Sequence, residues 1–290
     1  MPYYNFQKIR DGVYHITSKE GSFCQLLIGR DKALLFDTAY GYGALRSQIE
    51  EITKLPLVVV NSHGHPDHIN GNYQFPGPVY ISKRDYEMAL EQSSVDCRRY
   101  SAEGAKKYVT DRQKGRVEYI LPCEPYDVES YANAKMPEFD FLEDGQIFDL
   151  GDIKLQVIAI PGHTKGCICL WEEKQKILLA GDSFSPFTWL FDENSGSLSE
   201  YAKGLRKVMA MKPKYILCGH EAESVEASEL EAYLDAAEHC DYEKGMPWNP
   251  PIPGCEERRD IRVCARPGYV PFQFDKKGYA SIVISPDHLK

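Results

Sequence analysis

The chain has 290 residues, of which 43% are hydrophobic and 27% are charged, a composition typical of an ordinary globular protein. The formal net charge is −9, from 34 basic and 43 acidic residues, which argues against a dedicated nucleic-acid binder, because such proteins cluster positive charge. Nucleic acid is therefore not expected as a partner. We also expect no membrane partner, and a small molecule as the partner; the sequence does not indicate the oligomeric state.

The cysteines and the N-terminal residues indicate the cellular compartment in which the protein is expected. There are nine cysteines, an odd number, and no CxxC pair is present. The first residues, "MPYYNFQKIRDGVYHI", lack the apolar core of a signal peptide, and no run approaches the ~18 apolar residues of a membrane span. These features predict a cytoplasmic protein whose thiols are mostly small core residues.

Short strands separated by turns are predicted at the start of the chain, in "GVYHITS", "SFCQLLIG" and "KALLFDT". A helix is predicted next in "GALRSQIEEITK", where Leu45, Ile49 and Ile52 recur at helical spacing. The apolar run "LVVV" then predicts a buried strand that ends directly before a cluster of histidines.

The second half repeats this order of strands and helices. "QIFDLGDIKLQVIAI" predicts a hairpin that turns at Gly151 and Asp152, and "CICLWE", "KILLAGD" and "KYILCGHE" predict further strands. "LSEYAKGLRKVMAM" and "EASELEAYLDAAEHC" predict amphipathic helices. Two such halves predict an α/β fold, a four-layer αββα sandwich in a single domain over residues 1–290.

Two regions interrupt this plan. Residues from about 83 to 140 are charged and rich in tyrosine, and they predict a partly helical insertion. Residues from about 245 to 275 form a Pro-rich C-terminal segment. Such segments usually lie on the surface, either as plain decoration or to shape a binding site, and the sequence leaves both interpretations open.

The stretch "HGHPDH", residues 63–68, holds three of the eight histidines and an aspartate. His163, Asp182 and His220 also follow apolar runs. A lone histidine at a strand end is usually a hydrogen-bonded turn residue, but the repeated placement favours metal ligands. Imidazole and carboxylate groups suit zinc. The remaining histidines have no such context, and we expect them to be structural or solvated: His15, His239 and His288.

The order H-x-H-x-D-H, GH, GD and GH resembles that of the metallo-β-lactamase-fold hydrolase superfamily, from "LLFDTAYG" to "GHE". The resemblance implies the αββα fold and two divalent metal ions. Zinc is the metal expected, with iron and manganese as alternatives. It also implies the ligands. The first metal would be bound by His63, His65 and His163, the second by Asp67, His68 and His220, and Asp182 would bridge them.

The same resemblance implies a hydrolase that uses a metal-bridging hydroxide, with Asp67 as the catalytic group that orients the water. Asp37 is expected to hold the histidine loop, and a simple turn cap is the alternative. The substrate expected is a small ester: a thioester, a lactone or a carboxylic ester. Ser185 departs from the tyrosine of the lactonases, and Phe191 and Glu193 depart from the glyoxalase II pattern. A phosphodiesterase, or a metal-binding protein without turnover, remains the alternative.

The segment "SFSPFTWLF" is unusually apolar for a loop that follows a predicted ligand. It predicts an apolar wall near the metals, with a loop that faces the core as the alternative. The wall would hold the hydrophobic part of a substrate and would be made by Phe184, Phe187, Trp189 and Phe191.

Overall fold

The computed structural model describes residues 3–106, 121, 126–250, 255 and 257–290. Contacts along the chain divide it into two compact units, and each is described by itself. Unit 1 comprises Met1–Leu155 and Gly219–Ala222, and unit 2 comprises Gln156–Cys218 and Glu223–Lys290. The single domain stays a prediction. None of the helices in the described residues combines the length and apolar character needed to cross a membrane.

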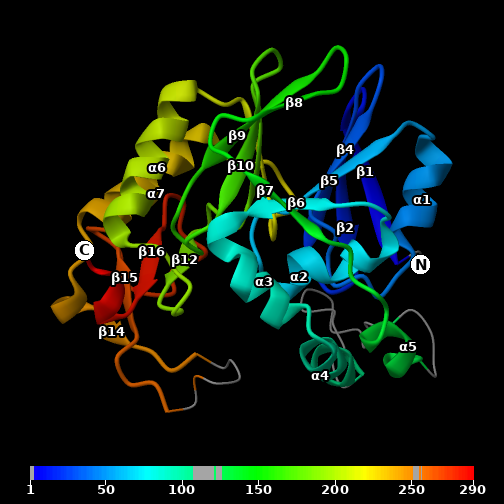
Figure 1. Ribbon diagram of the computed structural model, residues 1–290. Helices are drawn as coiled ribbons and strands as arrows, with labels where there is room; N and C mark the ends of the chain where they lie inside the picture. The colour runs from blue at the N-terminus through cyan, green and yellow to red at the C-terminus, as the bar shows by residue number, and fades with distance from the viewer. Residues whose placement is uncertain (1–2, 107–120, 122–125, 251–254, 256) are drawn as a thin grey trace. The chain divides into compact units, whose positions relative to one another are not determined.

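Unit 1 is built on a seven-stranded sheet in which β1 to β7 lie in chain order (Figure 1). β1 to β4 pair antiparallel, and β4 to β7 pair parallel. The strands are β1 Tyr4–Arg10, β2 Val13–Ser18, β3 Phe23–Ile28, β4 Ala33–Phe36, β5 Leu57–Val60, β6 Val79–Ser82 and β7 Phe139–Leu142, and β8 Ile147–Asp149 follows. The predicted strands β2 to β5 are confirmed, whereas β1, β6 and β7 were not predicted.

The helices of unit 1 follow β4, β5 and β6. They are α1 Leu45–Ile52, α2 Pro66–Ile69, η1 Asn70–Gln74, η2 Lys83–Asp85, α3 Tyr86–Gln92, α4 Val95–Ala105 and α5 Val128–Ala132. Leu45 and Ile49 of α1 are buried as predicted, but Ile52, at the end of the helix, is 37% exposed. The predicted insertion is helical over 83–105 and in α5, and its residues 107–120 and 122–125 lie outside the described residues.

One apolar core joins these helices to the sheet. Its members come from β3, β4, β5, α1, α4 and α5, and include Leu26, Leu35, Val59, Ile49 and Ala102. Because four parallel strands share this sheet, their carboxyl ends meet at one edge. The loops after β4 and β5, which carry Asp37 and the histidine cluster, therefore start side by side.

Gly71 allows the loops after β4 and β5 to approach each other. A Cβ atom at this position would lie 2.1 Å from the backbone oxygen of Thr38, and the Gly71 N–H donates to the carbonyl of Ala39 at 2.9 Å. Replacement of Gly71 by alanine should lower the free energy of unfolding by about 1–3 kcal/mol, because the two backbones must move apart. Urea denaturation would measure this loss.

Gly104→Ala is the matched control. This glycine lies in α4, and a Cβ atom there meets nothing within 4 Å. Alanine should leave the stability unchanged or raise it by up to ~1 kcal/mol, because it favours a helix more than glycine does. Equal urea midpoints for the two variants would contradict the close approach at Gly71.

Unit 2 contains a sheet in which β13, β11, β10 and β9 are neighbours in this order. A second sheet has the order β12-β16-β15-β14. The strands are β9 Lys154–Ala159, which begins in unit 1, β10 Ile168–Glu172, β11 Ile177–Gly181, β12 Phe187–Leu190, β13 Tyr215–Cys218, β14 Met246–Pro247, β15 Arg262–Ala265 and β16 Ser281–Ile284. The hairpin and the strands β10, β11 and β13 are confirmed.

Two long helices of unit 2 lie side by side (Figure 1), α6 Leu198–Met211 and α7 Ala227–Glu238. α6 begins at a capping box, in which Ser197 and Glu200 satisfy each other's backbone N–H groups. Its buried face carries Tyr201, Leu205 and Val208, as the sequence predicts. The short helices η3 Tyr242–Lys244 and η4 Pro286–His288 complete the unit.

The sheet formed by β12, β16, β15 and β14 was not predicted. β12 pairs parallel with β16, and β16 pairs antiparallel with β15. The sequence predicted a loop in "SFSPFTWLF" and a Pro-rich C-terminal segment over about 245–275. The pairing partners lie far apart in the chain, so the local pattern did not reveal them.

Candidate metal centre

The histidine cluster of unit 1 follows β5. Val60 pairs with Phe36 of β4 and with Tyr80 of β6, so the strand that enters the cluster is held on both sides. Pro66 then starts the short helix α2, which carries Asp67 and His68. Gly64 packs against α3, since a Cβ atom there would lie 2.8 Å from the Met88 methyl carbon.

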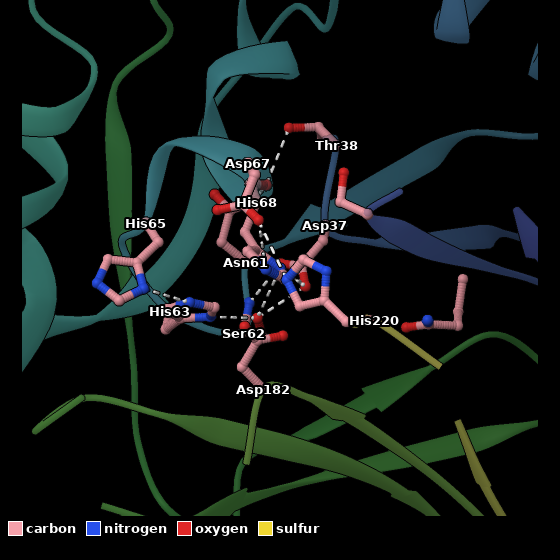
Figure 2. A network of polar contacts seen from close by, with 12 residues as sticks. Asp37, Thr38, Asn61, Ser62, His63, His65, Asp67, His68, Asp182 and His220 are labelled. Atoms are coloured by element: carbon pink, nitrogen blue, oxygen red, sulfur yellow. Dashed lines mark hydrogen bonds and ion pairs between the residues drawn. The ribbon is translucent and has the colours of Figure 1, made fainter. Parts of the chain in front are cut away.

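Asp37 is buried behind this cluster and accepts three hydrogen bonds (Figure 2). Its Oδ1 accepts from the Ser62 N–H at 2.7 Å, and its Oδ2 accepts from the Ser62 hydroxyl at 2.7 Å. The same Oδ2 lies 2.8 Å from Nδ1 of His68. Because Asp37 holds Nδ1 of His68, the Nε2 atom of that ring is the one directed to a ligand.

The backbone carbonyl of His68 is also fixed by hydrogen bonds. It accepts from the N–H and the hydroxyl of Thr38 at 2.9 and 3.1 Å, and from the side chain of Asn61 at 3.0 Å. Ser62, Thr38 and Asn61 therefore fix the orientation of a predicted ligand, a role that was not predicted from the sequence. Their only sequence signal is polarity next to the ends of β4 and β5.

His220 reaches the same cluster from a distant part of the chain. The segment 219–222 belongs to unit 1, where the Gly219 carbonyl accepts from the Phe23 N–H at 2.8 Å. Nδ1 of His220 lies 3.3 Å from the Gly21 carbonyl oxygen, which directs Nε2 to the opposite side of the ring. The backbone oxygen of Glu221 lies 2.9 Å from Nε2 of the buried His15, so His15 is structural, as expected.

Asp67, His68 and His220 form a group that fits a metal ion. Oδ2 of Asp67 lies 3.2 Å from Nε2 of His220 and 3.6 Å from Nε2 of His68 (Figure 2). One ligand atom from each of the three residues lies within 4.8 Å of the others. Two imidazoles and a carboxylate that converge at this spacing are a donor set suited to zinc and similar divalent ions.

His63 and His65 lie next to this group. Nδ1 of His63 is 2.8 Å from the Ser62 hydroxyl, and its Nε2 is 3.0 Å from Nδ1 of His65. Two imidazole nitrogens this close need a proton or a cation between them, since two lone pairs would repel. Burial and the charge of Asp67 raise the pKa of Tyr40, so this phenol stays neutral beside the carboxylate.

His163 and Asp182 lie near each other in unit 2. They follow β9 and β11, and Nε2 of His163 is 3.8 Å from Oδ2 of Asp182. The Ser195 hydroxyl donates to the His163 carbonyl at 3.0 Å. The imidazole also lies 6.4 Å from the ring of Trp189, measured between centroids. Each unit thus gathers its own share of the predicted ligands.

The predicted apolar wall divides into two kinds of residue. Phe184 is 1% exposed and Phe191 is 3% exposed, and both belong to apolar cores of unit 2. Their side chains are enclosed by core neighbours, so the prediction that they line a wall is corrected. Phe187 and Trp189 are only partly buried and keep an accessible face.

The family model of the metallo-beta-lactamase superfamily matches residues 19–220. The chain belongs to the metallo-β-lactamase superfamily. This match contains the histidine cluster, His163, Asp182 and His220, and it ends at the loop that returns His220 to unit 1. The predicted fold class is confirmed by the match.

Proteins of this superfamily similar to the chain include named hydrolases. The human acyl-coenzyme A thioesterase MBLAC2 is 24% identical over 199 residues, 63% of this chain and 67% of that protein. A hydroxyacylglutathione hydrolase of Mesorhizobium japonicum is 35% identical over 95 residues, 30% of this chain and 35% of that protein. A solved metallo-beta-lactamase from Pontibacter korlensis has a TM-score of 0.55 at 19% identity and covers 81% of this chain and 99% of its own. The chain is a metal-dependent hydrolase of this superfamily.

Proposed function

We propose that this hydrolase cleaves a small ester-type substrate, with a thioester as the favoured class. We propose a centre of two divalent ions, with zinc as the favoured metal. The observation that supports it is the convergence of Asp67, His68 and His220 in unit 1. The named relatives act on acyl-coenzyme A and on hydroxyacylglutathione, both of which are thioesters. Lactones and carboxylic esters share the same acyl chemistry.

The proposed ligand set is the one that the resemblance to the superfamily implies. His63, His65 and His163 would hold one ion, and Asp67, His68 and His220 would hold the other. Asp182 would bridge the two ions. Bound ions supply a water of lowered pKa and a positive charge that stabilises an oxyanion.

The residues of the chain supply orientation and proton transfer. Asp37 keeps Nε2 of His68 directed to the ligand side, and Ser62 does the same for Nε2 of His63 through its hydroxyl. The carboxylate of Asp67, whose Oδ2 lies 3.2 Å from Nε2 of His220, would accept the proton of the attacking water. Asp67 would then return that proton to the leaving thiolate, so that the thioester and one water yield a carboxylic acid and a thiol.

A substrate panel tests the proposal. Purified protein should contain two equivalents of zinc, iron or manganese, measured by mass spectrometry of the metals. Hydrolysis of acetyl-coenzyme A, of a lactone and of p-nitrophenyl acetate should disappear after chelation and return when metal is added back. Rates that a chelator does not change, or a preference for bis-p-nitrophenyl phosphate, would overturn it. Loaded protein without any turnover would leave metal binding as the function.

A further inference from the structure

Unit 2 carries a row of aromatic side chains beside the sheet formed by β12, β16, β15 and β14, which was not predicted from the sequence. β12 alternates, with Thr188 and Leu190 buried and Phe187 and Trp189 partly exposed. Leu190 belongs to the main core of the unit, while Phe187 and Trp189 pack against a small separate cluster. Because side chains alternate along a strand, Phe187 and Trp189 share the outer face of the sheet.

The row continues into the C-terminal segment. The centroid of Trp248 lies 6.3 Å from that of Trp189 and 5.2 Å from that of Phe187. The rings of Phe272 and Phe274 lie 5.6 and 5.5 Å from Phe187. We call these five residues the aromatic row: Phe187, Trp189, Trp248, Phe272 and Phe274.

One end of the aromatic row reaches a predicted metal ligand, and the other end reaches solvent. The ring of Trp189 lies 6.4 Å from that of His163, in the same unit. At the other end Phe272 is 38% exposed and Phe274 is 55% exposed. An apolar surface that is exposed at its end and leads to a catalytic group is typical of a binding site for an apolar substrate portion.

Two arginines of the C-terminal segment pair with carboxylates. Arg258 donates to the Phe191 carbonyl at 3.4 Å, but its guanidinium also pairs with both carboxylate oxygens of Asp260 at 2.7 Å. The guanidinium of Arg266 pairs with Asp235 at 2.9 Å. These described arginines are therefore engaged, and the row itself contains no charged side chain. The occupant that suits it is uncharged and flexible.

We propose that the aromatic row binds the acyl chain of the substrate, so that the substrates are thioesters of medium- and long-chain fatty acids. This inference rests on the proposed function, since it places the scissile carbonyl at the His163 end of the row. Trp248, Phe272 and Phe274 lie beyond the residues that the family model matches, 19–220. The outer part of the row is thus contributed by the C-terminal segment of this chain, and Phe187 and Trp189 come from within the match.

A series of acyl-coenzyme A thioesters from acetyl to palmitoyl tests the proposal with the metal-loaded enzyme. Each added CH₂ group that reaches the row should raise kcat/KM about fourfold, until the chain extends beyond the row. Trp248→Ser and Phe274→Ser should each lower kcat/KM for dodecanoyl-coenzyme A at least tenfold more than for the acetyl ester. Phe274 is exposed, so its replacement carries little risk to folding. Equal losses for both chain lengths, or none, would overturn the inference.

Phe141→Ser is the matched control, because Phe141 is 45% exposed on β7 of unit 1 and outside the row. It should leave the chain-length profile unchanged. Binding of dodecyl-coenzyme A thioether, which cannot be hydrolysed, should quench tryptophan fluorescence in the wild type and less in Trp248→Ser. If no thioester is cleaved, the proposed function fails and the binding assay still tests the row. If vesicles of phosphatidylcholine bind through Phe274 while the chain-length profile stays flat, the row contacts lipid surfaces and the inference is wrong.

Discussion

His220→Ala should lose one of two metal equivalents and lower kcat/KM by about 10²–10³-fold, because a bound ion contributes several kcal/mol of charge stabilisation. The side chain is 47% exposed, so its removal leaves little cavity. It forfeits the contact of Nδ1 with the Gly21 carbonyl oxygen, worth about 1 kcal/mol, and the contact of Nε2 with Oδ2 of Asp67. Metal analysis and steady-state kinetics on a thioester would measure both effects.

His239→Ala is the control for this result. His239 is exposed at the end of α7, where its Nδ1 lies 3.1 Å from the carbonyl oxygen and 2.9 Å from Oδ1 of Asp235. Its replacement should leave metal content and rate unchanged. If His220→Ala keeps two metals and the full rate, the second ion is not held by His220 and the proposed ligand set is wrong.

Asp37→Ala should destabilise the protein and weaken metal binding together. The substitution leaves the Ser62 N–H, the Ser62 hydroxyl and Nδ1 of His68 without their acceptor in a buried place. Each stranded donor costs about 1–3 kcal/mol, so the free energy of unfolding should fall by about 3 kcal/mol or more. Loss of the group that orients a ligand typically lowers metal affinity about 10–100-fold.

Urea denaturation of the metal-free protein separates these two effects, and metal titration of folded protein gives the affinity. Asp31→Ala is a suitable control, because Asp31 is an exposed carboxylate paired with Arg30 at the surface. It should change stability by well under 1 kcal/mol. A metal-free Asp37→Ala protein as stable as the wild type would show that Asp37 serves only as a turn residue.

The anchoring of the cluster explains why the site lies at this edge of the sheet. β4 and β5 are parallel neighbours, so Asp37 and Ser62 leave the sheet from adjacent strands. Asp37 adopts a left-handed backbone with φ of 66°, which aspartate tolerates better than most residues. The carboxylate thereby turns back under the histidine loop. The ligand geometry follows from the pairing of two strands.

Local patterns in the sequence predicted much of the fold and of the candidate site. Residues 63–68 are contiguous, so a strand followed by a tight turn places His63, His65, Asp67 and His68 together whatever the rest of the chain does. The strands β2 to β5, the hairpin at Gly151 and the buried face of α6 were also predicted, because periodicity and turn residues act over a few positions.

The tertiary structure alone decided where the distant residues lie. His220 follows β13 of unit 2, yet its loop belongs to unit 1 through Phe23 and Gly21. β12 becomes a strand only because β16 pairs with it from about a hundred residues further on, and that pairing places Phe187 and Trp189 outside and buries Leu190. The physical reason is that hydrogen bonds between distant strands, and the burial that follows from them, depend on which segments meet in space. The sequence by itself therefore determined the chemistry of the site. The tertiary structure decided where the loop that carries His220 lies and which aromatic side chains of β12 are exposed.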